Sequence, residues 1–381
     1  MPGTFQINKT SGLSRLGKFT TSNGSFETPN FMPVGTRGSV KGVDIERLAE
    51  AGAQIMLVNT YHLWLKPTAP IVRGLGGIHK FTGWQGPILS DSGGFQVFSL
   101  KSIRKISEEG VEFRSHIDGA KCFLSPEISI QTQEELGVDI AMVLDECPAG
   151  GCDFGYFERS LAMTQRWAAR SLAARRKETT SIFGITQGGS HRELRTRAAQ
   201  EIGALDFDGV AIGGLSVGEP KSEMYEVLSY HPQQLPAAKI RYLMGVGTPE
   251  DIVEAVRNGV DLFDCVMPTR AGRFGRAFIN ADEPTLNIKN SKNQNDTAPL
   301  DQNCSCLACR HHSRGYLHHL FKVGEMLGPQ LLSIHNLTHY LSLMRSIREA
   351  LAEDRFEALY REIQSRWAKV EEIGELGGVN G

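Results

Sequence analysis

Three carboxylates that could do chemistry follow short apolar runs in this sequence, namely Asp91, Asp145 and Asp264. Paired carboxylates perform displacement at an anomeric carbon, where one attacks or stabilises an oxocarbenium-like centre and the other moves protons. The alternative is that these residues only cap helices, a common role of Asp. Asp264 favours the chemical role, because the apolar residues 265–268 follow it.

Other runs end in groups suited to a flat heterocyclic ligand. The complete set of run-end residues is Asn59, Asp91, Asp145, Gln187, Gly213, Gly214, Gly245 and Asp264. An amide such as Gln187 beside the Asp145 carboxylate can read the donor and acceptor edge of a base. The Gly213-Gly214 pair would let backbone N–H groups approach such a ligand closely.

A cysteine cluster predicts a metal site, because Cys304, Cys306 and Cys309 lie within six residues. Zinc prefers tetrahedral sulfur and nitrogen ligands, and a Cys3His set with no open position is structural, not catalytic. Spacing alone does not choose the fourth ligand, and the candidates are His311, His312, His318, His319, His335 and His339.

The apolar runs predict the elements that position these groups. They span 54–60, 87–94, 139–146, 181–189, 209–216, 240–247 and 260–265, with a candidate eighth at 285–290. Unbroken apolar runs are typical of strands buried on both faces of a parallel sheet. Amphipathic stretches at 159–178, 191–205 and 249–260 alternate with the later runs. This rhythm predicts an α/β fold, a closed (β/α)8 barrel, with an open doubly wound sheet as the alternative. Chemistry in such a barrel lies where the strands end.

Two segments interrupt the rhythm. Residues 97–130 alternate around Asp118-Gly119, which predicts a β-hairpin laid on the barrel. The stretch from 291 to about 340 is first polar and then rich in Cys and His, and the segment from about 336 to 372 is predicted to be helical. We therefore expect a barrel domain over 1–290 with β insertions at the N-terminus and at 97–130, a zinc-binding subdomain over 291–340, and a helical segment over 341–381 that completes the barrel.

Composition excludes several classes of protein. The 381 residues are 40% hydrophobic and carry a formal net charge of −2, so the chain is neither disordered nor basic overall. Residues 270–322 nevertheless carry eight Lys and Arg against four Asp and Glu, which predicts a local site for a polyanion. We expect no membrane span and no secretory signal, and with seven cysteines we expect a reducing cytoplasm.

These residues together resemble the bacterial tRNA-guanine transglycosylases of the queuine tRNA-ribosyltransferase family. The segments that carry the resemblance lie in the same order along nearly the whole chain: NTYHL (59–63), SDSGGFQVFSL (90–100), VLDECP (143–148), ITQGG (185–189), IGGLSVGE (212–219), YLMGVGTPEDI (242–252), FDCVMPTR (263–270), CSCLAC (304–309) and IHN (334–336). The resemblance implies a (β/α)8 barrel, a structural Zn²⁺ ion in each subunit and a homodimer. It also implies a pentosyltransferase that exchanges guanine for 7-aminomethyl-7-deazaguanine at the wobble position of GUN-anticodon tRNAs.

The resemblance also implies roles for individual residues of this sequence. Asp264 matches the nucleophile and Asp91 the general acid/base. Asp145, Gln187 and the Gly214 N–H match the guanine-reading groups, and Phe95 and Met244 match the residues that stack on the base. The Leu215 carbonyl with Glu219 matches the aminomethyl site, and Cys147 and Val217 occupy positions that separate bacterial from eukaryotic members. Arg270, Arg273 and Arg276 are expected to hold tRNA, and Cys304, Cys306, Cys309 and His335 to bind zinc.

Three alternatives remain at this point. A non-catalytic partner subunit should lack one of the two catalytic carboxylates, and both Asp91 and Asp264 are present. A glycoside hydrolase on the same barrel would carry aromatic sugar platforms, whereas this chain has four Trp and none in the strand-end motifs. An archaeal relative acting in the D-arm would carry an appended RNA-binding domain, for which no further chain remains.

Overall fold

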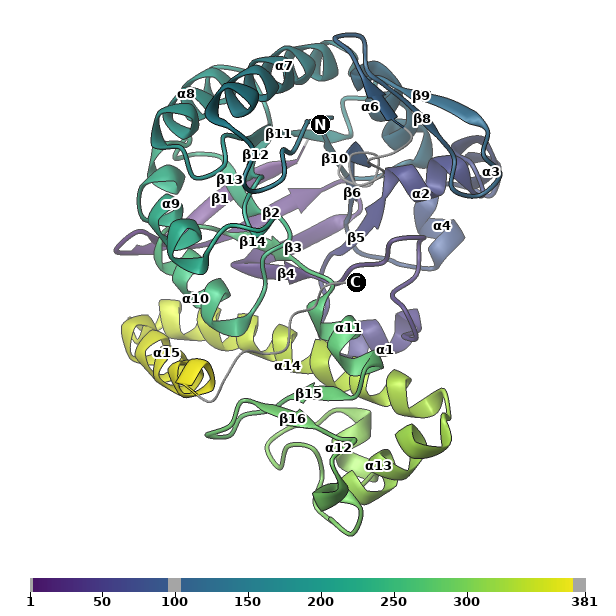
Figure 1. The fold of residues 1–381 in the computed structure, drawn as a ribbon, viewed down its shortest axis with the longest axis vertical. Helices are drawn as coiled ribbons and strands as arrows, with labels where there is room; N and C mark the ends of the chain where they lie inside the picture. The colour runs from purple at the N-terminus through teal and green to yellow at the C-terminus, as the bar shows by residue number, and fades with distance from the viewer. Residues whose placement is uncertain (1–2, 95–103, 373–381) are drawn as a thin grey trace.

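The structure, a computed structural model, describes residues 3–94 and 104–372. Its main sheet has eight parallel strands in the order β4-β14-β13-β12-β11-β10-β6-β5 (Figure 1). The strands are β4 (Asn30–Met32), β5 (Met56–Asn59), β6 (Ile88–Asp91), β10 (Ile140–Met142), β11 (Ser181–Thr186), β12 (Gly209–Ile212), β13 (Ile240–Leu243) and β14 (Leu262–Asp264).

The two outer strands of this sheet meet and close it into a barrel. Val34, just after β4, forms a parallel bridge with Leu57 of β5. The Gly35 N–H donates to the Leu57 carbonyl over 2.7 Å, and the Leu57 N–H donates to the Pro33 carbonyl over 3.0 Å. The predicted barrel is therefore confirmed, and the open doubly wound sheet is wrong.

Seven of the eight predicted strands are confirmed, and the eighth is wrong. The barrel strand that closes the sheet is β4, which pairs with β14 through Phe31 and Phe263. Residues 285–287 instead form β16 (Thr285–Asn287), which is antiparallel to β15 (Arg276–Phe278) in a separate two-stranded sheet. The physical reason is visible in the burial pattern, because the barrel strand β4 is buried throughout, whereas β16 buries only Leu286.

Helices surround the barrel and its extensions. Those that follow the early strands are α1 (Ile45–Glu50), α2 (Thr60–Leu65), α3 (Ala69–Gly74), α4 (Ile78–Thr82) and α6 (Pro126–Leu136). The later ones are α7 (Phe154–Ala173), α8 (Arg192–Gly203), α9 (Lys221–Gln234), α10 (Pro249–Arg257) and α11 (Met267–Arg273). The amphipathic stretches predicted at 159–178, 191–205 and 249–260 correspond to α7, α8 and α10.

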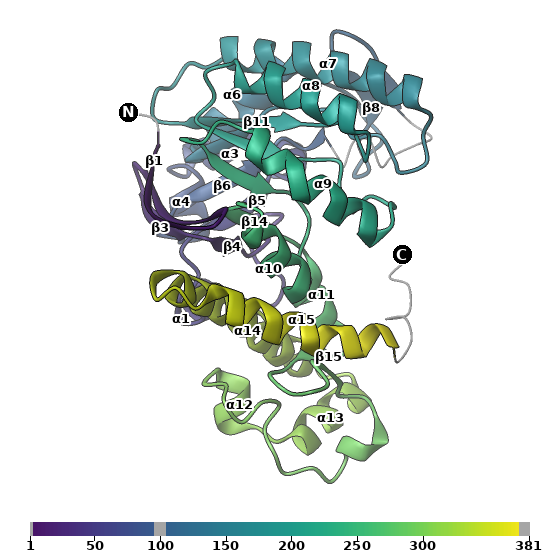
Figure 2. The same cartoon turned by 90° about the vertical axis from the view of Figure 1, so that its left-hand side faces the viewer.

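A three-stranded antiparallel sheet covers the amino-terminal end of the barrel (Figure 2). Its strands are β1 (Thr4–Ser11), β2 (Ser14–Thr21) and β3 (Gly24–Thr28). Arg15 forms a buried ion pair with Asp261, just before β14, and Asn23 donates to Asp139, just before β10. The opposite end, where the strands stop, is therefore left for the polar run-end residues.

The predicted hairpin within 97–130 is confirmed for its described part. β7 (Arg104–Ile106), β8 (Val111–Arg114) and β9 (Lys121–Leu124) form an antiparallel sheet, and the turn between β8 and β9 holds Gly119 at φ +73°. Val111, Phe113 and Leu124 pack with Tyr61 and Trp167, so the hairpin lies against α2 and α7.

The last part of the chain packs as a second cluster (Figures 1 and 2). It contains β15, β16, the 3-10 turn Ser291–Asn293, α12 (Leu307–His311) and α13 (Arg314–Val323), and it rests on α14 (Leu327–Ala352), which α15 (Phe356–Glu372) follows. Leu286 and Ile288 belong to this cluster. The packing therefore changes at β15, whereas the domain boundary at residue 290 stays a prediction.

α11 and α14 cross closely at Gly272. A Cβ there would lie 2.7 Å from the Ser333 nitrogen, so only Gly permits this approach. Among the described residues, no helix combines the length and apolar character needed to cross a membrane.

Candidate active site and metal centre

Asp91 and Asp264 stand at the carboxyl ends of β6 and β14. Asp91 lies opposite Asn59 in the register of β5 and β6, and the Asn59 amide donates to Asp91 Oδ2 over 2.7 Å. On β14, Asp264 Oδ1 accepts hydrogen bonds from the Tyr242 hydroxyl at 2.6 Å and from the Gly245 N–H at 2.8 Å. Asp264 Oδ2 accepts none from the described residues, so this carboxylate is oriented by one oxygen and open at the other.

The three run-end carboxylates influence one another electrostatically. Burial, together with the charges of Asp145 and Asp264, raises the pKa of Asp91 to about 7, against hydrogen bonds from the Ser92 and Gly93 backbone. Burial also raises the pKa of Asp264, which the Tyr242 and Gly245 hydrogen bonds oppose. A carboxyl group with a pKa near neutrality can both donate and accept a proton at working pH.

Helix capping explains one run-end residue and not the others. Asn59 caps α2, since its side-chain oxygen accepts from the His62 N–H. The cap of α11 is Val266 and that of α7 is Asp153, so neither Asp264 nor Asp145 caps the described helix that follows it. The capping alternative is therefore wrong for these two carboxylates.

Asp145 and Gln187 form a pair at the ends of β10 and β11. The Gln187 amide donates to Asp145 Oδ2 over 2.6 Å, and burial raises the pKa of Asp145 to about 6 despite this bond. The side chain of Gln187 lies against the glycine pair, since a Cβ at Gly213 would be 2.7 Å from its Nε2 and one at Gly214 2.2 Å from its Oε1. Gln187 Oε1 is buried and has no partner among the described residues.

The loop after β12 holds Leu215, Val217 and Glu219 beside this pair. The Glu219 carboxylate accepts from the Ser216 N–H and, over 2.9 Å, from the Val217 N–H. In a trans peptide the carbonyl points opposite to the N–H, so the Leu215 carbonyl points away from Glu219. The loop is also tied to the loop after β10, because the Val217 carbonyl accepts from the Gly150 N–H over 3.3 Å.

Cys147 and Met244 border the same place. Burial raises the pKa of the Cys147 thiol to about 12, the Asp145 charge adds to this, and contacts with the Gln187 side chain and the Gly214 N–H oppose it. Met244 is half-buried against the barrel core, and its N–H donates to the Ile212 carbonyl over 3.2 Å. Phe95, the other predicted stacking residue, lies outside the described residues.

The predicted RNA-binding arginines lie on α11 and β15. Arg270 and Arg273 are half-buried on α11, and the pKa of Arg273 is lowered by burial and by the neighbouring charge of Arg270. Arg276 begins β15, where its carbonyl accepts from the Asn336 amide over 2.9 Å. α11 follows β14 directly, so these cations are one short helix away from Asp264.

Cys304, Cys306, Cys309 and His335 converge on one point, with ligand atoms all within 4.8 Å of one another. His335 Nδ1 lies 3.3 Å from the Cys309 sulfur and 3.5 Å from the Cys306 sulfur. Its Nε2 lies 2.7 Å from the Phe278 carbonyl, which can only accept, so Nε2 carries the hydrogen and Nδ1 is free to bind a metal. Three sulfurs and one imidazole fit a tetrahedral zinc ion.

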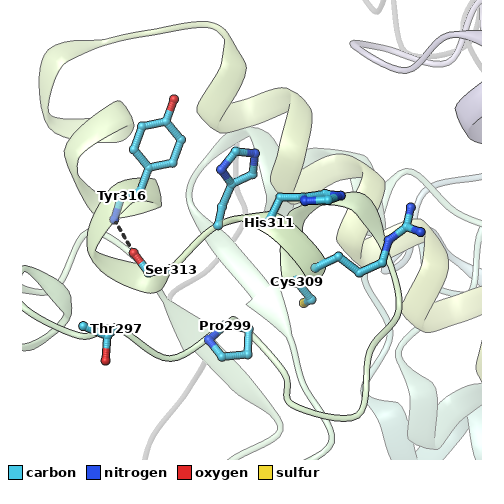
Figure 3. Close-up of a pocket in the computed structure, with 8 residues that line it drawn as sticks. Thr297, Pro299, Cys309, His311, Ser313 and Tyr316 are labelled. Atoms are coloured by element: carbon cyan, nitrogen blue, oxygen red, sulfur yellow. Dashed lines mark hydrogen bonds between the residues drawn. The ribbon is translucent and has the colours of Figure 1, made fainter.

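The geometry decides among the six candidate histidines. His318 Nδ1 pairs with the Ile288 carbonyl at 2.8 Å, and His339 stacks on Phe278. His311 and His312 lie next to each other at the end of α12 and line a pocket with Tyr316 (Figure 3). Among the described residues, only His335 completes a metal-binding group with the cysteines.

Comparisons with known proteins agree with this geometry. The family model described as "Queuine tRNA-ribosyltransferase" matches residues 10–369. A protein of that name from Azotobacter vinelandii is 52% identical over 355 residues, which are 93% of this chain and 95% of the relative. Another from Chromobacterium violaceum is 52% identical over 367 residues, 96% of this chain and 98% of the relative. The chain belongs to the queuine tRNA-ribosyltransferase family. This membership confirms the predicted family and class of enzyme, and it excludes a glycoside hydrolase.

In this member of the queuine tRNA-ribosyltransferase family, sequence reasoning missed two residues beside the site. Tyr242 lies inside β13, where its position in an apolar run predicts only a core residue, yet its hydroxyl donates a hydrogen bond to Asp264. Arg195 lies on α8 and is fully buried. Its signal was available, because Arg195 shares the buried face of α8 with Leu194, Ala198 and Ile202, where a charge is unusual.

Proposed function

We propose that the protein is a tRNA-guanine transglycosylase of queuosine biosynthesis that works in the cytoplasm. Its substrates would be GUN-anticodon tRNAs, those for aspartate, asparagine, histidine and tyrosine, and it would replace guanine at the wobble position with 7-aminomethyl-7-deazaguanine. The observation that carries the proposal is that Asp91 and Asp264 stand at the carboxyl ends of two barrel strands, at the end of the barrel that also holds the Asp145–Gln187 pair. A site for anomeric displacement thus adjoins a site for a base.

The reaction would proceed by double displacement. Asp264 Oδ2 attacks the ribose anomeric carbon as the bond to guanine breaks, and the departing base takes the bonding electrons and a proton from Asp91. The tRNA is then held as an ester of Asp264. The incoming base loses a proton to Asp91 and attacks the same carbon, which releases Asp264. One N-glycosidic bond replaces another, so the scheme uses neither ATP nor a redox cofactor.

Base recognition would use the groups around Gln187. The Asp145 carboxylate would accept from the guanine N–H edge, while Gln187 and the Gly214 N–H would contact its carbonyl edge. Phe95 and Met244 would stack on the base. The Leu215 carbonyl, with Glu219 behind it, would accept from the aminomethyl group, and Cys147 and Val217 would exclude the bulkier queuine.

Zinc would occupy the Cys3His site and would hold the lobe that carries tRNA contacts. Its four ligands leave no open position, so the ion would be structural. Arg270, Arg273 and Arg276 would bind tRNA phosphates, because guanidinium groups match phosphate geometry.

We also propose that two copies form a homodimer. Exposed side chains on α13 and before α14 support this. Tyr316, which lines the pocket of Figure 3, is 39% exposed and stacks on His312 at 4.9 Å between ring centroids, and Met326 is 86% exposed. Exposed apolar and aromatic side chains are typical of interaction surfaces. A non-catalytic partner subunit is the alternative function, and the presence of both Asp91 and Asp264 opposes it.

The test is exchange of radiolabelled guanine into a GUN-anticodon tRNA, with an anticodon-altered tRNA as control. Asp264→Asn should abolish exchange and the tRNA–protein adduct that survives denaturation, because an amide cannot attack. Asp91→Asn should slow exchange roughly 10²–10⁴-fold, the usual effect of a lost general acid/base. An adduct that forms in Asp264→Asn and is absent in Asp91→Asn would require the two roles to be exchanged.

A further inference from the structure

Arg195 is a buried cation with an unusual set of partners. Its side chain is 0% exposed on the inner face of α8. A buried guanidinium is normally paired with a carboxylate. Here every hydrogen bond of the side chain goes to a backbone carbonyl, and no ion pair joins Arg195 to a described carboxylate. Burying a guanidinium charge without a carboxylate costs free energy. We therefore ask what the segments bound by Arg195 do.

Those segments are the two loops that carry the base-reading groups. Arg195 Nε donates to the Gly189 carbonyl over 2.7 Å, in the loop after β11. Its two terminal nitrogens donate to the Gly213 and Gly214 carbonyls over 2.8 and 3.0 Å, in the loop after β12. Gln187 stands two residues before Gly189, and its side chain lies against Gly213 and Gly214. One rigid planar group therefore joins both loops at fixed spacing.

The contact with Gly213 orients a specific N–H group. The Gly213 carbonyl and the Gly214 N–H belong to one trans peptide and point in opposite directions. Because the carbonyl is held by Arg195, the Gly214 N–H must point away from Arg195. The Gln187 side chain, which donates to Asp145, lies against the same two glycines.

The contact with Gly214 holds a conformation that few residues adopt. Gly214 has φ +65°. A Cβ at Gly214 would lie only 2.2 Å from Gln187 Oε1, so the Gln187 side chain leaves no room for one. The glycine pair and the Gln187 amide therefore fit together only while the loop keeps this shape. Glycine by itself is free to leave it, so an external clamp is required.

We propose that Arg195 is a positioning residue for base recognition, holding the Gly214 N–H and the Gln187 amide in the geometry that reads the purine. The inference rests on the proposed function. Arg195 touches neither substrate nor reacting atoms in this scheme. Its loss should weaken binding of the free base while leaving tRNA binding intact.

Arg241 offers a matched control at the other end of the barrel. It is also a buried arginine, at 6% exposure, and its guanidinium also donates to backbone carbonyls, those of Gly259 and Leu235. These lie before β14 and β13, at the amino-terminal end, far from Gln187 along both strands. A general loss of packing should therefore affect Arg195→Lys and Arg241→Lys alike.

The experiment compares wild type, Arg195→Lys and Arg241→Lys, each as the full chain. Lysine keeps the charge but cannot span the carbonyls with a planar fork. We expect the guanine KM and the directly measured guanine Kd to rise about 10-fold or more in Arg195→Lys, the change for one or two lost hydrogen bonds. In Arg241→Lys both should stay within about twofold of wild type, and the tRNA Kd should be unchanged in both variants.

The outcomes separate the inference from the proposed function. A wild-type protein that fails to exchange guanine would overturn the proposed function, and guanine binding would still test the clamp. A guanine Kd in Arg195→Lys equal to that of Arg241→Lys, at comparable loss of thermal stability, would overturn the inference. If Arg195→Lys does not fold, Arg195→Gln is the second variant, because its amide keeps two N–H donors without a buried charge.

Discussion

At the scale of single residues, the raised pKa that suits Asp91 to proton transfer also lowers the stability of the protein at high pH. Its pKa of about 7 arises because burial and two neighbouring carboxylates disfavour the charge. A raised pKa means that the folded state binds a proton more tightly than the unfolded chain. The stability that Asp91 contributes is therefore complete below its ordinary pKa of 3.8 and is lost as the pH rises through about 7.

Asp91→Asn should accordingly stabilise the protein at pH 8 by up to about 4 kcal/mol and much less near pH 4, because the pKa rises from 3.8 to about 7 and one pKa unit corresponds to about 1.4 kcal/mol. The measurement is the free energy of unfolding of both proteins across this range. Asp118→Asn is the control, since hydrogen bonds lower the pKa of that exposed carboxyl and its removal gives no gain at pH 8. A gain of equal size at both pH values would contradict the assigned cause.

The rule of selecting the polar residues that end the apolar runs finds some residues of the site and misses others. It selects Asp91, Asp145 and Gln187, because each follows a buried apolar run and the ends of parallel strands share one face. It cannot select Tyr242 or Arg195, because one lies within a strand and the other on a helix. Their roles depend on which carbonyl or carboxylate lies opposite, which only the fold determines.

At the scale of elements, the loop after β12 depends on backbone shape. In Gly214→Ala, the new Cβ would collide with Gln187 Oε1 and the residue would have to keep φ +65°. We expect guanine exchange to fall at least about 10-fold, with a stability loss of roughly 1–2 kcal/mol from the left-handed conformation. The readouts are the guanine KM and the free energy of unfolding.

Gly137→Ala is the matched control for this change. Gly137 also has a left-handed φ, +81°, and its Cβ would meet nothing within 4 Å. It should lose similar stability and keep guanine exchange. Equal losses of exchange in the two variants would mean that backbone strain, and not the contact with Gln187, limits the site.

α14 joins the metal centre to α11 and β15. Beside His335, the Asn336 amide donates to the Pro268 and Arg276 carbonyls over 2.9 Å each, and its oxygen accepts from the Phe278 N–H. The Asn336 side chain thus connects the neighbour of a metal ligand to α11, the helix that carries Arg270 and Arg273.

Cys306→Ala should therefore lose bound zinc, destabilise the second cluster and weaken tRNA binding, because metal–ligand bonds supply folding free energy. Metal content, the thermal midpoint and the tRNA Kd are the measurements. Cys122→Ala, at a free cysteine of the hairpin, should retain all three. Full tRNA exchange by a metal-free protein would show that zinc does not organise the tRNA-binding lobe.

The elements themselves were mostly predictable, with one instructive error. Long buried runs such as Ser181–Thr186 are recognisable as strands of a parallel sheet. β4 is only three residues long and stands between Pro29 and Pro33, so it has almost no pattern. The sequence at 285–290 has more β-like residues, but they pair in an antiparallel hairpin of the second cluster.

At the scale of the whole molecule, positive charge is concentrated in one stretch of the chain. Residues 270–322 carry a net charge of +4, whereas residues 1–269 and residues 323–381 carry −3 each. The acidic parts repel polyanions and the basic stretch attracts them, so electrostatics should orient tRNA before any contact with the site.

Arg276→Ala should weaken tRNA binding and lower the slope of log K against log salt by about 0.7–0.9, the value for one lost phosphate contact. The guanine Kd should not change. Arg197→Ala is the control, because Arg197 lies on α8 and pairs with Glu201 and Glu158. An unchanged salt slope in Arg276→Ala would remove Arg276 from the RNA-binding surface.

The pairing of the first barrel strand with the last determines when the barrel can finish folding. β4 must pair with β14, and Arg15 must pair with Asp261, yet the ribosome releases the first member of each pair long before the second. Until β14 emerges, β4 can bridge only to β5, and the edge of β4 that binds β14 stays open. The chain therefore completes its fold late in translation, and the stretch between β4 and β14 is the interval in which chaperones would protect it.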